Sequence, residues 1–145
     1  MTGKIFRNFV LISFIVFAVS VGLFMGVLYG NFSDTLDAEL VQQTELLGDG
    51  LEYGGIGYLE KINLPNRVTW VDAQGTVLYD NQASAVGMEN HADREEIREA
   101  LETGFGQSER HSVTISERTV YAARRLADGT VIRVAESQRT ALAML

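Results

Sequence analysis

The segment VGMENHADREE, from Val86 to Glu96, gathers one histidine, four carboxylates, one arginine and one asparagine. Histidine and carboxylate side chains carry out acid–base catalysis and bind metals, but they are also common where a helix begins. Asn90 is predicted to cap a helix over residues 92–103, with carboxylates in its first turns and Gly104 as its C-cap. We interpret the segment as a helix start in preference to a catalytic or metal site.

The rest of the sequence contains no stronger candidate for a catalytic or metal site. It has no cysteine and only two histidines, His91 and His111, without the H-x-x-x-H or paired-carboxylate spacing of a metal site. The residue types of a catalytic triad occur at Ser84, His91 and Asp93, but no nucleophile elbow or oxyanion loop accompanies them. We therefore predict no catalytic residue, no metal and no cofactor in this chain.

Composition limits the chain to one folded domain and an N-terminal segment. At 145 residues and 46% hydrophobic content, it can bury the core of one domain. The formal net charge is −7, and no run of Lys or Arg offers a surface for phosphate backbones, which argues against a nucleic-acid partner.

An uncharged apolar run predicts a transmembrane helix over residues 9–30. Lys4 and Arg7 precede it, so the positive-inside rule leaves residues 1–8 in the cytoplasm and residues from 31 onward outside. All 19 acidic residues and 10 of the 12 basic ones follow this span. We expect a protein of the cell membrane with an acidic extracytoplasmic part.

A long helix is predicted over residues 31–52, directly after the span. Leu36, Leu40, Leu47 and Leu51 lie near one stripe. The stripe either packs on its own domain, which we favour, or pairs with the same helix of a second copy. Glycine-rich turns around a short helix near 58–62 are expected to follow.

Five short antiparallel strands are predicted within residues 67–136, with the helix 92–103 inserted after the second. Their sequences are rich in β-branched and aromatic residues: RVTWVD, TVLYD, RHSVTI, TVYAARR and TVIRVAE. The predicted fold class is α+β, with one transmembrane helix leading into a domain that has a five-stranded antiparallel sheet flanked by helices.

Four segments carry a resemblance to a known family: RVTWVDAQGTVLYD, MENHADREEIREAL, GFGQSERHS and VYAARRLADGTVIRVAES. From about Gly54 to Ser137 the chain resembles the PAS-like (Cache-type) sensor region of phosphate-regulon-like sensor histidine kinases of Gram-positive, clostridial-type bacteria. The resemblance implies an extracytoplasmic sensor domain over residues 31–140. It makes residues 141–145 the possible start of a second transmembrane helix.

By this resemblance the chain senses a signal and relays it across the membrane to a cytoplasmic kinase that this sequence does not contain. The resemblance implies a homodimer. ATP, magnesium and a response regulator would belong to the missing part. Other classes stay open: the sensor domain of a chemoreceptor or of a cyclic-dinucleotide enzyme, or a stand-alone membrane-anchored binding module.

In PAS-like domains the ligand pocket lies between the sheet and the segments that cross it. This implies an extracellular small molecule, ion or protein signal, and the candidate lining residues are Trp70, Tyr79, Met88, His91, Arg94, Arg110 and Tyr121.

Each type of candidate residue has a structural alternative. The three aromatic residues are also typical of a sheet core. Arg94 and Arg110 suit an anion, unless Glu95, Glu99 or Glu109 satisfies them internally. The histidine is a candidate pH reporter, or it hydrogen-bonds a loop.

Overall fold

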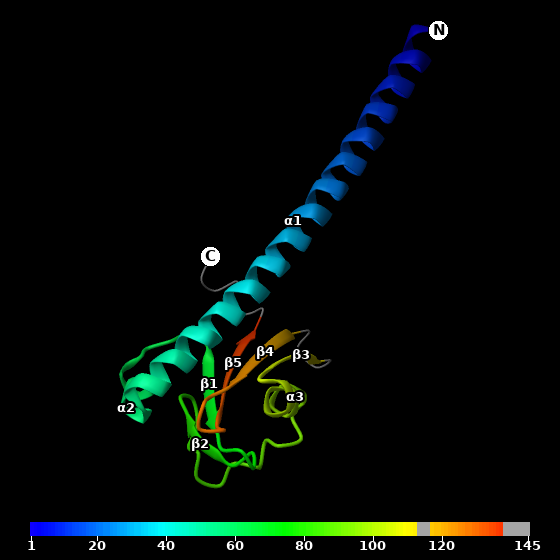
Figure 1. Cartoon of the computed structure of the whole chain (residues 1–145). Coiled ribbons are helices and arrows are strands. Elements are labelled where there is room, and N and C mark those ends of the chain that lie inside the picture. Colours follow the sequence, from blue (N-terminus) through cyan, green and yellow to red (C-terminus); the bar gives the residue numbers. More distant parts are fainter. Residues whose placement is uncertain (113–116, 138–145) are drawn as a thin grey trace. The chain divides into compact units, whose positions relative to one another are not determined.

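The computed structural model describes residues 1–112 and 117–137. Its elements are α1 (Thr2–Gly54), α2 (Ile56–Lys61), β1 (Arg67–Val71), β2 (Val77–Asp80), α3 (Glu95–Thr103), β3 (Phe105–Ser112), β4 (Glu117–Arg125) and β5 (Val131–Ser137) (Figure 1). The chain divides into two compact units, Met1–Asp37 and Ala38–Leu145.

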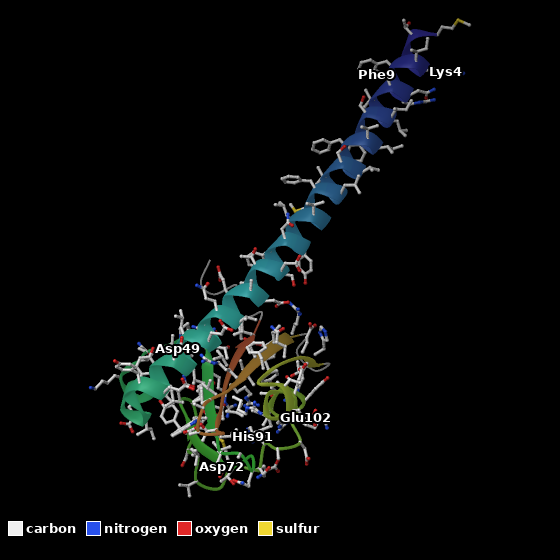
Figure 2. The ribbon with its side chains drawn as sticks, in the orientation of Figure 1. Lys4, Phe9, Asp49, Asp72, His91 and Glu102 are labelled. Carbon is white, nitrogen blue, oxygen red and sulfur yellow. The ribbon has the colours of Figure 1, made fainter. Side chains whose placement is uncertain are left out.

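The first unit is helical and carries the apolar run. Its side chains project from the helix on all sides, from Lys4 and Phe9 onward (Figure 2). An 18-residue window within α1 has a mean hydropathy of 2.6, and none of it is buried. By length and composition, α1 is therefore the one helix in the described residues that is suited to cross a membrane.

The second unit is built on a five-stranded antiparallel sheet with the order β2-β1-β5-β4-β3 (Figure 1). Glycines with positive φ lie in the tight turns of two hairpins of the sheet, Gly75 at 85° between β1 and β2 and Gly129 at 86° between β4 and β5. The predicted α+β fold class, with five antiparallel strands and flanking helices, is confirmed.

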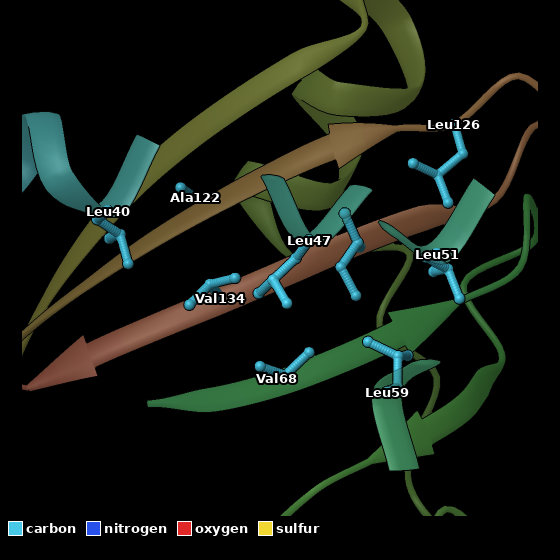
Figure 3. Close-up of a cluster of buried hydrophobic side chains, with 9 residues drawn as sticks. Leu40, Leu47, Leu51, Leu59, Val68, Ala122, Leu126 and Val134 are labelled. Atoms are coloured by element: carbon cyan, nitrogen blue, oxygen red, sulfur yellow. The ribbon is translucent and has the colours of Figure 1, made fainter. Parts of the chain in front are cut away.

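One face of the sheet is covered by the second part of α1 and by α2. Leu40, Leu47 and Leu51 of α1 pack with Leu59 of α2 on apolar side chains of the sheet such as Val134 (Figure 3). The leucine stripe from Leu40 onward thus packs on its own domain, as favoured from the sequence. Burial of these side chains supplies much of the stabilisation of this layer.

The other face of the sheet is covered by α3. Ile97 and Ala100 of this helix are fully buried and cluster with Val71, Ala123 and Val131. Because side chains alternate along a strand, neighbouring residues of β4 and β5 pack into the two cores on opposite faces of the sheet.

The predicted start of the inserted helix is wrong by three residues. α3 begins at Glu95, and its N-cap position is Arg94, without a side-chain capping bond. The Asn90 Oδ1 instead accepts the N–H of Ala92 at 2.8 Å, and its Nδ2 donates to the Gln74 carbonyl at 2.9 Å. Asn90 therefore ties a turn to the β1–β2 hairpin and does not cap the helix.

The end of α3 lies where the sequence placed it. Gly104 is the C-cap, with a φ of 99°, and its N–H donates to the Ala100 carbonyl at 2.8 Å. β3 follows at once from Phe105, five residues before the predicted RHSVTI strand. Its polar residues have low strand propensity, but the ladder with β4 holds them in the sheet. The predicted strand residues 113–115 and the possible second span at 141–145 lie outside the described residues.

Candidate functional site

A cavity of about 510 Å³ opens on the α3 side of the sheet. Strands β1, β3, β4 and β5 form its floor, and the segment between β2 and α3 lies beside it. The lining residues are Pro65, Arg67, Gln82, Met88, Glu89, His91, Arg94, Arg110, Thr119, Tyr121, Arg133, Ala135 and Ser137. Its size is that of a small-molecule pocket.

The structure brings five of the seven candidate lining residues together at this cavity: Met88, His91, Arg94, Arg110 and Tyr121. Trp70 and Tyr79 are not among them. These two pair directly across β1 and β2, and both pack on the core beneath α1. The alternation of side chains along β1 places Trp70 on the face opposite to Thr69, which contacts the cavity residue Arg133.

The two aromatic residues on the far face have internal hydrogen-bond partners. The Trp70 Nε1 donates to the Thr130 Oγ1 at 2.9 Å, and the Tyr79 hydroxyl donates to the Leu59 carbonyl at 3.4 Å. Their surroundings are those of sheet-core aromatics.

Glu96 is the carboxylate beneath the cavity, and its side chain is fully buried. It accepts hydrogen bonds from Ser108 Oγ at 2.6 Å, Arg110 Nη2 at 3.1 Å and Arg133 Nη1 at 3.0 Å. Burial by itself raises the pKa of Glu96, but the bonds from Ser108 and Arg133 outweigh it and hold the pKa below the ordinary value. Glu96 is therefore an anion that ties α3 to β3 and β5.

Arg133 is the most deeply buried cation of the site, with 4% of its surface exposed. Its Nη1 donates to Glu96, and its Nη2 donates to the Thr69 Oγ1 at 3.2 Å. Its Nε is buried and has no hydrogen-bond partner in the described part of the chain. Burial lowers the pKa of Arg133, although a guanidinium stays charged at any physiological pH.

The ring of Tyr121 lies against two guanidinium groups. The Cζ of Arg110 is 4.5 Å from the ring centroid, and that of Arg133 is 5.1 Å from it. These are cation–π distances, so the tyrosine helps to hold both arginines at the cavity.

A second ion pair lies at the β1 side of the cavity. The Asp80 carboxylate accepts bonds from Arg67 Nε and Thr69 Oγ1, both at 2.9 Å, and from the N–H groups of Gln82 and Ala83. Burial raises the pKa of Asp80, but the bonds from Gln82 and Arg67 hold it below its ordinary value. Arg67 is thus neutralised within the domain.

The two arginines singled out from the sequence differ in their surroundings. Arg110 is satisfied in part by Glu96, which is none of the three glutamates expected to do so. Arg94 is half-buried, and its side chain has no partner in the described residues. Arg94 is therefore the arginine of the cavity whose side chain no described residue engages.

Sequence reasoning missed Arg67, Glu96 and Arg133 as parts of the site. In the sequence, Glu96 is one of several carboxylates predicted for the first turns of a helix. For Arg133 a signal existed, because it is the one charged residue within the apolar run VIRVA of the last strand. A charge inside such a run is retained only when it has a partner or a function.

His91 makes hydrogen bonds that hold its own loop, and it is 7% exposed. Its Nδ1 lies 2.8 Å from the Glu89 carbonyl, and its backbone N–H donates to the Gly75 carbonyl at 2.8 Å. Burial lowers the pKa of His91 below 6.5; the bond to Glu89 opposes this shift, and the charge of Arg133 adds to it. The ring is therefore neutral at pH 7.

We expect the ring of His91 to titrate below its ordinary pKa of 6.5 in the folded chain. Since the folded state binds this proton less tightly than the unfolded state, His91 costs stability as the pH falls below about 6.5. An NMR titration of a His111→Gln variant, which keeps His91 as the single histidine, measures the value. A pKa at or above 6.5 would contradict the described burial.

No group of three His, Cys, Asp or Glu residues suited to hold a metal ion occurs in the described ranges 1–112 and 117–137. The donors of the site are mainly guanidinium groups, which bind carboxylates and phosphates and do not ligate metals. Chemically, the arrangement can hold an anion.

Comparisons with known proteins give a structural likeness. No protein-family model and no curated protein matches the chain. A solved structure described as the "extracellular domain of the putative histidine kinase" is similar at 18% identity and a TM-score of 0.43, over 65% of this chain and 40% of that one. At this identity and score, the likeness assigns neither family nor function.

Proposed function

We propose that this chain is the extracytoplasmic signal-sensing portion of a two-component sensor histidine kinase, with a PAS-like (Cache-type) domain. One observation carries the proposal: a small-molecule cavity lined by four arginines lies in the domain that follows a helix suited to cross a membrane. The resemblance of the sequence to phosphate-regulon-like kinases of clostridial type supports the choice of kinase over chemoreceptor. The kinase domain, with ATP, magnesium and the response regulator, belongs to the part beyond this chain.

The packing of the sheet suggests how a signal would be relayed. β5 contributes Arg133, Ala135 and Ser137 to the cavity, and its other face supports the leucines of α1. A ligand that shifts β5 would therefore act on the second part of α1, the helix that also contains the predicted span, and on the chain that leaves β5 after Ser137. In a homodimer, such a shift would alter the cytoplasmic kinase pair.

The parent gene provides the first test of this proposal. Beyond the codon for Leu145 we expect a second apolar span, followed by a helix with an H-E-x-x-T-P-like phosphoacceptor sequence. In membrane vesicles, the full protein should then autophosphorylate on that histidine. A stop codon after the domain, or methyl-accepting or cyclic-dinucleotide domains in place of the kinase, would overturn the proposal.

The proposed orientation is tested by cysteine labelling, which benefits from the absence of native cysteine. Tyr53 is 99% exposed in the sheet domain, and Thr2 precedes the span. In intact cells, a membrane-impermeant maleimide should label a Tyr53→Cys variant and leave a Thr2→Cys variant unlabelled until the cells are lysed. The reverse pattern would place the domain in the cytoplasm.

A further inference from the structure

We propose that the cavity beside α3 binds a small organic carboxylate, held by the guanidinium groups of Arg94 and Arg110 with support from Arg133. The inference rests on the proposed sensing function and names the class of its stimulus.

The cavity is cationic although the domain is acidic. Its lining includes four arginines, Arg67, Arg94, Arg110 and Arg133, while the nearby carboxylates are Asp80, Glu89 and Glu96. The surrounding sequence carries an excess of acids. A positive cavity in such a domain raises the local concentration of anions and disfavours cations.

Several guanidinium donors of the cavity have no protein acceptor among the described residues. The side chain of Arg94 has none. Arg110 donates through Nη2 alone, to Glu96. The Nε of Arg133 is buried and unpartnered in a side chain that is 5% exposed. A buried donor without an acceptor is costly, and a bound carboxylate close to these groups would supply acceptors and negative charge.

The carboxylate of Glu96 shows that arginines of this site bind a carboxylate. It already binds Arg110 and Arg133 from the α3 side. A ligand carboxylate on the cavity side would meet Arg94 and the remaining donors of Arg110, so that each anion is shared between two cations.

The size and lining of the cavity favour an organic anion over an inorganic one. A volume of about 510 Å³ exceeds what phosphate or sulfate needs, and it lies within the range of small-molecule pockets. Met88, Tyr121 and Ala135 offer apolar surface beside the arginines. A short carbon chain would contact this surface while its carboxylate binds Arg94.

Calorimetric titration of the full chain in detergent micelles tests the inference. The probes are a panel of short mono-, di- and tricarboxylates, including acetate, succinate and citrate, with phosphate and sulfate at matched ionic strength. We expect saturable binding of at least one carboxylate. An Arg94→Gln variant should weaken it about tenfold to hundredfold, the usual effect of losing a charge-assisted bond.

Arg98→Gln is the matched control, because Arg98 is exposed one turn further along the same helix. It should leave the affinity unchanged. The fluorescence of the single tryptophan, Trp70, verifies that both variants are folded. The inference is overturned if no carboxylate binds, if phosphate or sulfate binds as well as the carboxylates, or if Arg94→Gln and Arg98→Gln have equal effects.

Two combined outcomes separate this inference from the proposed function. Carboxylate binding by this chain, in a parent protein without a kinase domain, would overturn the proposed function and leave the inference standing. A working sensor kinase whose cavity binds no carboxylate would overturn the inference alone.

Discussion

Replacing Glu96 by alanine is expected to lower the free energy of unfolding of the sheet domain by about 3–5 kcal/mol. The carboxylate is fully buried and is the acceptor shared by Ser108, Arg110 and Arg133. Its removal leaves the guanidinium of Arg133 buried without a counter-ion, which is the costly way to break a buried pair.

Urea unfolding of the full chain in detergent, followed by the fluorescence of Trp70, measures this loss. Trp70 is the single tryptophan and lies in the sheet domain, so its signal reports on this unit. Glu95→Ala is the matched control, because Glu95 is the exposed neighbour on the same helix. A loss below about 1 kcal/mol for Glu96→Ala would mean that the cluster is hydrated and not buried.

The same cluster should make stability depend on acid. The pKa values of Glu96 and Asp80 are lowered in the folded state from their ordinary values of 4.5 and 3.8. Their contribution is therefore complete above about pH 4.5 and is lost as the pH falls through the folded pKa values. Glu96→Gln should flatten this part of the stability profile, whereas Glu95→Gln should leave its slope unchanged.

Leu47→Ala is expected to cost about 2–5 kcal/mol in the free energy of unfolding. Leu47 is 3% exposed and lies in the core cluster between α1 and the sheet. Its truncation removes buried apolar surface and leaves a cavity between packed layers, and both effects favour the unfolded chain.

The neighbouring residue provides the control for this prediction. Leu46 is 60% exposed on the same helix, so Leu46→Ala has the same effect on composition and helix propensity without loss of core. We expect a change within about 0.5 kcal/mol for it, measured in the same way. A cost equal to that of Leu47→Ala would show that Leu46 is covered by another surface, such as a second copy of the chain.

The local sequence patterns predicted the elements but not all of their limits. β-branched and aromatic residues marked β1, β2, β4 and β5, and glycine marked the C-cap of α3. The first half of β3, with Gly106 and Gln107, lacks such a signal. The ladder with β4 and the close approach of α3 decide its course, since a Cβ at Gly106 would collide with the Glu96 carbonyl oxygen.

The sequence predicted the candidate site in part. The resemblance to PAS-like domains implied seven candidate lining residues, and five of them line the cavity. Trp70 is one of the two that do not line it, because the alternation of side chains along β1, which the resemblance does not take into account, places Trp70 in the opposite core.

By itself, the sequence determined the apolar helix, the leucine stripe, the five strands and the acidic character of the domain, because each depends on local composition or on a short period. Only the tertiary structure decided which charges meet. Glu96 and Arg133 are far apart in sequence, and they pair because α3 packs across β5 and excludes water from both. Ion pairing of this kind depends on burial and distance, which no local pattern encodes.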